Sequence, residues 1–572
     1  MMTDVRTLAL RRRSFLAWCS RAGVGATLFP GALWAASDEG RSEITTAMVE
    51  QAARLAGLDF SGAELERMLA GVRANLESFR ARPAGAIPQD VAPPLHFDPV
   101  PPGRSVPTPA AAFALGPRAP VRRPARLEDV AFWPITDLAT LIETRQVSCL
   151  ELTRLYLARI GRFDGLLNAV VTVTEQRALR QARRLDEELA EGRYRGPLHG
   201  IPWGAKDLLA TRGYRTTWGF ESYAEQLLDL DATVVERLDA AGAVLLAKLS
   251  TGEIARGDVW LGRQTRNPWK TDEGSGGSSA GPAAATAAGL VAFSIGTDTL
   301  GSIVGPARTC GVTGLRPTFG RVSRHGVMPV CWSLDKVGPL CRTAEDCALV
   351  FDAIAGPDGL DRAVADVPFA WDGRRGLAGL RVGVLADALA REAAGARADA
   401  RANDQATLAS LRELGLSPVE VALPEHADMD ALQMLLVDES AAFEELLATG
   451  DARYFRQDLD DPEDVLMRIA RLFPAVEYVQ VQRRRALLME GMAELFDRID
   501  VLVAPFGGST QQSATSLTGH PSVSVRNGFD RDGRPTGIQF VGSLYGEADV
   551  LTLARHYEAH TPWVGRHPDA FV

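Results

Sequence analysis

The feature that most constrains the fold is a series of short apolar stretches separated by segments with helical character. Alternation of such strands with helices is typical of a sheet that is covered by helices on both faces. The sequence therefore predicts an α/β domain with a mixed, largely central β-sheet over residues 128–572. Within it, residues 356–475 are rich in Ala, Leu, Asp and Arg, and we expect a variable, mainly helical insertion there. The apolar stretches lie at 169–173, 243–248, 291–295, 380–385, 501–505, 522–525 and 537–541.

Two segments ahead of this domain have a different character. Residues 36–82 are expected to be helical, since Ser61 and Glu64 form a capping-box pattern and apolar residues follow at helical spacing. Residues 83–127 are rich in proline, which predicts an extended linker or a strap along the surface. Ser148 and Glu151 form a second capping-box pattern, and we expect a helix from there to about residue 162.

The first 35 residues resemble a twin-arginine export signal. Three arginines, 11–13, precede Ser14-Phe15-Leu16, and a mostly apolar stretch then runs from Ala22 to Trp34. That stretch is too short, and too interrupted by Gly and Pro, to cross a membrane, which takes about 20 residues. An ordinary helix start remains an alternative. The pattern predicts the twin-arginine export machinery as a partner and a periplasmic or secreted protein after signal removal.

Charge and composition narrow the function. The formal net charge of −10 argues against a nucleic-acid binder, which usually has a basic face. The chain has only four lysines, compared with 58 arginines. The lysines are Lys206, Lys248, Lys270 and Lys336. A buried lysine can lose its proton and act as a base, whereas arginine stays protonated, although codon bias would also leave a few lysines. The five cysteines beyond the signal are irregularly spaced, so we expect mostly buried thiols.

Three glycine-rich segments are candidates for chemistry. They cover residues 200–207, 274–281 and 296–303, and they contain Lys206, Ser278 and Ser302 respectively. A serine hydroxyl is a weak nucleophile that needs a neighbouring base, and a lysine with a lowered pKa can serve. Glycines permit tight turns whose backbone N–H groups can hold the oxyanion of a tetrahedral intermediate.

With these segments the chain resembles the amidase signature family, from about residue 130 to 565. Further matching pieces are Asn267-Pro268-Trp269, Gly314-Leu315-Arg316-Pro317-Thr318, Leu517-Thr518-Gly519-His520-Pro521 and Gly537-Ile538-Gln539. The resemblance implies the amidase signature fold and a serine hydrolase that cleaves the carbon–nitrogen bond of a small amide through an acyl-enzyme.

The resemblance also implies the roles of individual residues. Ser302 is expected to be the nucleophile, Ser278 the middle serine after a cis peptide bond, and Lys206 the base. The expected oxyanion hole is formed by the backbone N–H groups of Thr299, Leu300 and Gly301, together with that of Ser302. Neither cofactor nor metal is expected, and a homodimer is allowed.

Two residues depart from the family pattern beside the nucleophile. Leu300 stands where the family usually has glycine, and Val304 where it usually has arginine. The resemblance implies that this arginine pairs with the aspartate at the position of Asp298. We therefore expect Asp298 to have another partner, or the loop to be reshaped.

Other functions remain as alternatives. Gly277–Gly281 fits a nucleophile elbow centred on Ser279, and His556 with His560 has a spacing that can bind zinc on a helix. Within the family, the alternatives are the glutaminase subunit of a tRNA-dependent amidotransferase and an ester or carbamate hydrolase. An exported binding module without turnover is the non-enzyme alternative.

Substrate contacts are expected from residues 356–475 and from the loop at Cys331-Trp332.

Overall fold

The computed structural model describes residues 44–55, 58–81, 97–105, 113–118, 120–385, 395–429, 432–456, 463–506 and 509–572. The predicted export signal lies outside these residues. Contacts divide the chain into two compact units, Met1–Ile87 and Pro88–Val572. In the described part of the chain no helix combines the length and apolar character needed to cross a membrane.

Among the described residues of the first unit, the expected helical segment holds α3 (Thr46–Leu55) and α4 (Gly62–Ala81). Ser61 marks the start of α4, where its N–H and hydroxyl both donate to the Glu64 carboxylate, at 2.8 and 2.7 Å. Arg73 on α4 donates to the carbonyl of Ile44, which ties the two helices together.

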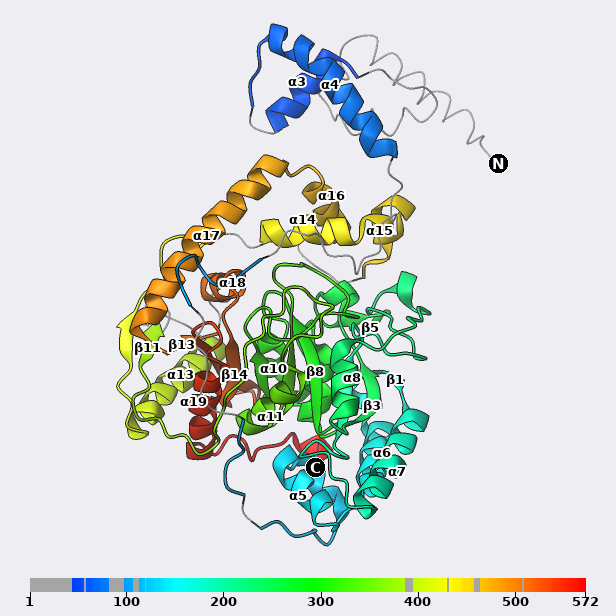
Figure 1. Cartoon of the computed structure of the whole chain (residues 1–572), viewed down its shortest axis with the longest axis vertical. Coiled ribbons are helices and arrows are strands. Elements are labelled where there is room, and N and C mark those ends of the chain that lie inside the picture. Colours follow the sequence, from blue (N-terminus) through cyan, green and yellow to red (C-terminus); the bar gives the residue numbers. More distant parts are fainter. Residues whose placement is uncertain are drawn as a thin grey trace. The chain divides into compact units, whose positions relative to one another are not determined.

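The second unit is built on one eleven-stranded mixed sheet covered by helices (Figure 1). Its strand order is β1-β3-β2-β8-β10-β9-β14-β15-β13-β11-β12. Strands β2, β3 and β8 run parallel to one another, as do β11, β12 and β13, and the other neighbours are antiparallel. The strands are β1 Val170–Val173, β2 Pro202–Lys206, β3 Val244–Leu249, β8 Phe293–Asp298, β9 Thr313–Arg316, β10 Lys336–Cys341, β11 Val382–Leu385, β12 Val419–Val421, β13 Val501–Pro505, β14 Ser522–Phe529 and β15 Pro535–Gly542.

Helices join these strands, and two small ribbons lie outside the main sheet. The ribbons pair β4 (Val259–Trp260) with β5 (Arg263–Gln264) and β6 (Arg266–Asn267) with β7 (Lys270–Gly274). The helices are α5 Ile135–Glu143, α6 Cys149–Leu167, α7 Glu175–Ala190, α8 Thr233–Ala240, α9 Ala280–Ala287, α10 Val304–Cys310, α11 Ala344–Ile354, α13 Ala396–Glu413, α14 Leu432–Ala442, α15 Glu444–Thr449, α16 Glu463–Ala470, α17 Ala475–Arg498, α18 Ser509–Leu517 and α19 Glu547–His560.

All seven apolar stretches form strands of the main sheet, which confirms the predicted fold class. The helix at Ser148 is also confirmed. Its hydroxyl accepts from the Glu151 N–H and its own N–H donates to the Glu151 carboxylate, although α6 extends to Leu167 rather than residue 162. Figure 1 shows α6 side by side with α7, next to β1 and β3.

Residues 356–475 differ from the helical insertion that composition suggests. Residues 357–380 contain no helix, and β11 and β12 belong to the main sheet. The helical part within the described residues consists of α13 to α16, with the start of α17 at Ala475. The Ala- and Leu-rich composition does not separate buried parallel strands from helices, because both are apolar.

Described pieces of the proline-rich segment belong to the second unit and pack on its other residues. Phe97 packs edge-on against Phe319 with ring centroids 5.0 Å apart, and the guanidinium of Arg485 lies 3.4 Å from its ring centroid. Further along, Ala114 exchanges backbone hydrogen bonds with Trp371 and Gly373. These pieces are therefore in contact with the body of the second unit.

The interior of the second unit holds two apolar clusters. The larger packs on the sheet and includes Trp203, Phe293 and Phe540. The smaller, which we call the upper cluster, includes Trp218 and Phe443 together with side chains of α14 and α17. All five described cysteines are buried and unpaired, as expected for thiols in a large core.

Candidate functional site

Lys206 is placed by the end of β2, between β3 and β8 in the sheet. Its side chain is fully buried, and its Nζ lies 2.8 Å from Ser278 Oγ and 2.8 Å from Thr297 Oγ1. Burial lowers the pKa of Lys206 to about 7, against the opposing effect of Asp298 and Asp335. A substantial fraction of this lysine is therefore a neutral amine near pH 7, which is what a general base requires.

Ser278 lies in the turn before α9, directly after a cis peptide bond between Gly277 and Ser278. The turn packs closely on another backbone segment. A Cβ on Gly277 would lie only 1.7 Å from the carbonyl oxygen of Gly257, so the close approach requires glycine.

Ser302 follows β8 and is partly exposed. Its carbonyl oxygen accepts the N–H of Ser279 at 3.1 Å, which joins the two serine segments through their backbones. Ser279 itself is buried, and its hydroxyl bridges the N–H and the carbonyl of Thr297 on β8. Because this hydroxyl is used to bind a strand, the geometry does not favour the nucleophile elbow centred on Ser279.

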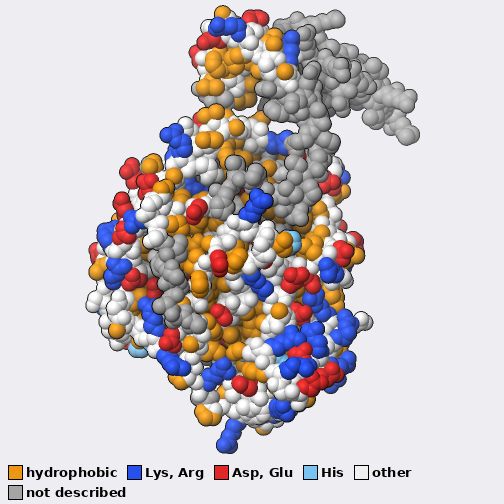
Figure 2. Space-filling view, in the orientation of Figure 1, with side chains coloured by type: hydrophobic (Ala, Val, Ile, Leu, Met, Phe, Trp, Pro, Cys, Tyr) orange, Lys and Arg blue, Asp and Glu red, His pale blue; other side chains and the backbone are white. Residues whose placement is uncertain are grey.

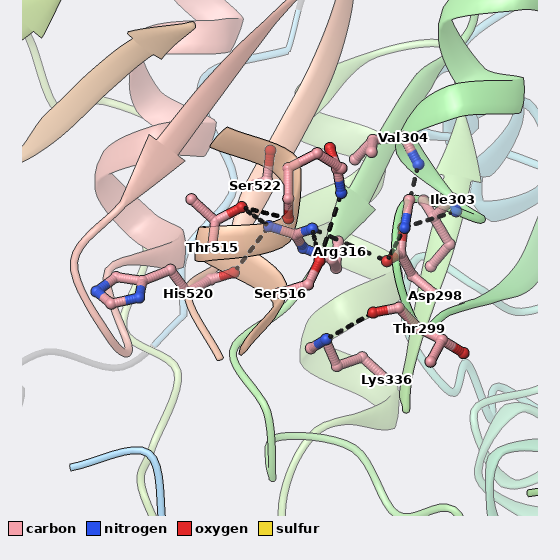
Figure 3. Close-up of polar contacts among 12 residues, drawn as sticks. Asp298, Thr299, Ile303, Val304, Arg316, Lys336, Thr515, Ser516, His520 and Ser522 are labelled. Carbon is pink, nitrogen blue, oxygen red and sulfur yellow. Dashed lines mark hydrogen bonds and ion pairs between the residues drawn. The ribbon is translucent and has the colours of Figure 1, made fainter. Parts of the chain in front are cut away.

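Asp298 organises the segment that carries Ser302. Its buried carboxylate accepts from the N–H of Gly301 at 2.8 Å, of Ile303 at 2.8 Å and of Val304 at 3.4 Å (Figure 3). Gly301 has φ of +120°, a conformation that favours glycine. The Gly301 N–H is thus directed at Asp298, unlike in the predicted oxyanion hole.

The other N–H groups near Ser302 differ from that of Gly301, because they are not hydrogen-bonded within the described protein. Among the residues that the structure describes, the N–H groups of Thr299, Leu300 and Ser302 have no hydrogen-bond partner. The expected donors Thr299, Leu300 and Ser302 therefore have N–H groups that no other described residue engages.

The basic side chain that pairs with Asp298 comes from β9 and not from position 304, which begins α10. Arg316 ends β9, is fully buried, and brings its guanidinium to 3.9 Å from Asp298 Oδ1. It also donates to Ser516 Oγ, to Thr515 Oγ1 and to the carbonyl of His520 (Figure 3). The expectation of another partner for Asp298 is confirmed, and the partner is Arg316.

Thr299 is held by two residues at the start of β10, namely Asp335, which directly precedes the strand, and Lys336, which is its first residue. The hydroxyl of Thr299 donates to Asp335 Oδ1 at 2.7 Å. Its carbonyl lies 3.5 Å from Lys336 Nζ, as Figure 3 shows. Asp335 also accepts from the N–H groups of Val330 and Cys331. Burial and the nearby charge of Arg316 lower the pKa of Lys336 to about 7. Motif reasoning missed Thr297 and Asp335, whereas the scarcity of lysine had singled out Lys336.

The loop at Cys331-Trp332 is tied to helices of the 356–475 region and its neighbour. The thiol of Cys331 donates to Asp438 on α14 at 3.0 Å, and the hydroxyl of Tyr478 on α17 donates to the same carboxylate at 2.8 Å. Leu300 and Trp332 are half-buried against the upper cluster. Apolar surface thus lies beside the segment of Ser302.

His556 and His560 do not share a partner. One ring faces the carbonyl of Arg375 and the other the carboxylate of Glu413. Within the described ranges no group of three or more His, Cys, Asp or Glu side chains is placed to hold a metal ion.

Comparison with known proteins agrees with this geometry. Residues 151–551 match the family model described as Amidase. The chain is 36% identical over 486 residues to the A-subunit of glutamyl-tRNA(Gln) amidotransferase from Methylococcus capsulatus, covering 76% of this chain and 98% of the relative.

Solved structures give the same result. The native peptide amidase from Stenotrophomonas maltophilia is 32% identical with a TM-score of 0.67, covering 76% of this chain and 98% of that one. An amidase family protein from Bacillus anthracis is 26% identical with a TM-score of 0.68, covering 77% and 93%. The chain therefore belongs to the amidase signature family and is an enzyme that hydrolyses amide carbon–nitrogen bonds.

Proposed function

We propose that this enzyme cleaves small amides through a Ser302–Ser278–Lys206 triad and an acyl-enzyme intermediate. The observation that carries the proposal is the 2.8 Å contact between Lys206 Nζ and Ser278 Oγ in a buried site. Burial supplies what the chemistry needs, since it lowers the pKa of Lys206 to about 7. The partly exposed position of Ser302 leaves its hydroxyl reachable by a substrate.

The steps follow from these positions. Neutral Lys206 takes the proton of Ser278, which takes that of Ser302 as its oxygen attacks the amide carbonyl. The oxyanion accepts from the N–H groups of Thr299, Leu300 and Ser302. Ser278 then passes its proton to the leaving amine, and water hydrolyses the Ser302 ester by the same route in reverse.

A covalent probe tests the nucleophile. We expect a fluorophosphonate to add one adduct per chain, mapped by mass spectrometry to Ser302, and to label Lys206→Met at least about 100-fold more slowly. Lys270→Met is the matched control, because Lys270 lies on the ribbon strand β7 and should label at the normal rate. Adducts at Ser279, or full activity of Ser302→Ala, would refute the triad.

A second candidate function rests on the curated relatives. Identity of 36% to one component of an amidotransferase favours a glutaminase that works within a complex. The likeness to a peptide amidase favours an enzyme that works without partner proteins. Turnover of aryl amides and peptide amides by the purified chain supports the second, whereas activity on glutamine that requires added amidotransferase components supports the first. Ester and carbamate substrates belong in the same screen, because the triad can attack those carbonyls too.

We also propose export to the periplasm or the medium by the twin-arginine machinery. The support is the arginine-rich start followed by an apolar stretch in residues 1–35. Replacing Arg12 and Arg13 by lysine should retain the enzyme in the cytoplasm, as cell fractionation would show. Unchanged distribution of this variant would argue against the proposal.

A further inference from the structure

The carboxylate of Asp298 is a buried charge with a defined task. It receives the N–H groups of Gly301 and Ile303 at 2.8 Å and so fixes residues 299–303, which we call the serine loop. A carboxylate without contact with water is stable in its ionised form only if hydrogen bonds and a counter-charge compensate it. The N–H groups supply the hydrogen bonds, and a cation is still required.

Three basic side chains surround Asp298, but they differ in their charge. Lys206 and Lys336 feel its field, yet burial lowers the pKa of each to about 7, so neither is a permanent cation. Arg316 keeps its charge, as guanidinium groups in proteins do. Among the described residues it is also the basic side chain that comes within 4 Å of Asp298.

The other contacts of Arg316 leave its charge for Asp298. Its hydrogen bonds go to the hydroxyls of Thr515 and Ser516 and to the carbonyl of His520, all of them neutral oxygens (Figure 3). These groups belong to α18 and to the turn after it. They hold the guanidinium in place without neutralising it.

We propose that Arg316 is a positioning residue of the proposed active site and acts through Asp298 on the serine loop. With Arg316 in place, the Asp298 carboxylate is held where it accepts the Gly301 N–H. The N–H groups of Thr299, Leu300 and Ser302 are then left oriented for the oxyanion. Without the cation, the buried carboxylate lacks its counter-charge and turns away from these N–H groups, and the loop loses its fixed form. The inference rests on the proposed role of Ser302 as the nucleophile.

The first test separates catalysis from binding. We expect Arg316→Met to lower kcat for an aryl amide by about 100-fold, the effect of losing one oriented donor, with KM changed by less than about threefold. Arg316→Lys should recover much of kcat, because it restores a cation. The matched control is Arg159→Met, which also removes a buried arginine that binds carbonyl oxygens, but on α6 and without contact with Asp298. It should lose stability and keep kcat.

The second test is a double-mutant cycle. If Arg316 acts through Asp298, kcat of Asp298→Asn/Arg316→Met should equal that of Asp298→Asn, because the two residues form one unit. This comparison also holds if Arg316→Met alone does not fold, since the double variant leaves neither buried charge unpaired. Additive losses, or an Arg316→Met enzyme with normal kcat, would overturn the inference. Ser302→Ala is assayed alongside, and its full activity would instead refute the proposed function.

Discussion

At the scale of single residues, two buried lysines with a pKa near 7 lie on either side of β8, and they are not equivalent. Lys206 contacts Ser278, whereas Lys336 contacts the carbonyl of Thr299. The charges that act on Lys206 are those of Asp298 and Asp335, and both oppose the effect of burial. The pH dependence of the reaction, compared with that of a variant that lacks Lys336, should therefore distinguish the two amines.

The first prediction concerns that pH dependence. Only the neutral form of Lys206 can accept a proton, and this form predominates above its pKa of about 7. We expect kcat/KM to be constant above that pH and to fall about tenfold per pH unit well below it. Initial rates from pH 5 to 9 on an uncharged amide measure this.

Lys336→Met provides the control for this assignment. Its own pKa is also about 7, so the acidic limb would vanish in this variant if Lys336 were the group that titrates. A limb that persists in Lys336→Met assigns it to Lys206. A limb that disappears would contradict the role of Lys206 as the base.

At the scale of elements, the sheet is held around the site by a buried ion pair. Lys248 on β3 lies 2.9 Å from Asp207, which directly follows β2, and both side chains are fully buried. This pair joins the strand that carries Lys206 to its neighbour.

The second prediction is that Lys248→Met lowers the free energy of unfolding by about 3–5 kcal/mol, because it leaves the Asp207 carboxylate buried without its cation. Denaturant unfolding followed by circular dichroism measures the change. Lys270→Met, at a half-buried position on β7, should change stability by less than about 0.5 kcal/mol. Equal effects of the two substitutions would show that the pair is not a source of stability.

The third prediction concerns the start of α6. Ser148→Ala removes the acceptor of the Glu151 N–H and should cost about 1 kcal/mol of stability. Ser148→Asp keeps an acceptor and should restore most of that loss. A cost that persists in the aspartate variant would mean that packing of the serine, rather than capping, stabilises this end.

The sequence predicts some elements well and others poorly, for physical reasons. The seven strands found in advance are apolar runs, whereas β2 contains Pro202 and Gly204 and has a composition typical of a turn. It forms a strand because β3 and β8 flank it on both sides.

Sequence motifs likewise identify Lys206, Ser278 and Ser302 as candidate catalytic residues. The contact of Arg316 with Asp298 depends on how β8 and β9 pack and is not encoded by local pattern.

At the scale of the whole molecule, the chain consists of two units with a boundary after Ile87. The residues beyond that boundary include Phe97, which packs on Phe319 and beneath Arg485, and Arg104, which pairs with Asp497 at 2.7 Å. The boundary and these contacts predict where the chain can be shortened.

The fourth prediction is that removal of residues 1–87 leaves the melting temperature and kcat of the second unit unchanged. Removal of residues 1–112 should lower the melting temperature by several degrees, because it exposes the apolar surface under Phe97, at a cost of about 2 kcal/mol. Thermal unfolding of both truncated chains measures the difference. Equal melting temperatures would show that the contacts of Phe97 and Arg104 add no stability.

The scarcity of lysine at the surface determines where amine-reactive reagents can couple to this protein. On the face drawn in Figure 2, basic side chains lie among acidic ones, and nearly all of the basic residues of this chain are arginines. Three of the four lysines, Lys206, Lys248 and Lys336, are buried, and Lys270 is the one whose side chain reaches solvent. Amine-reactive reagents should therefore couple to the folded protein at Lys270 and the chain terminus alone. The enzyme can therefore be attached to a support or a dye at these two amines, without engineered residues.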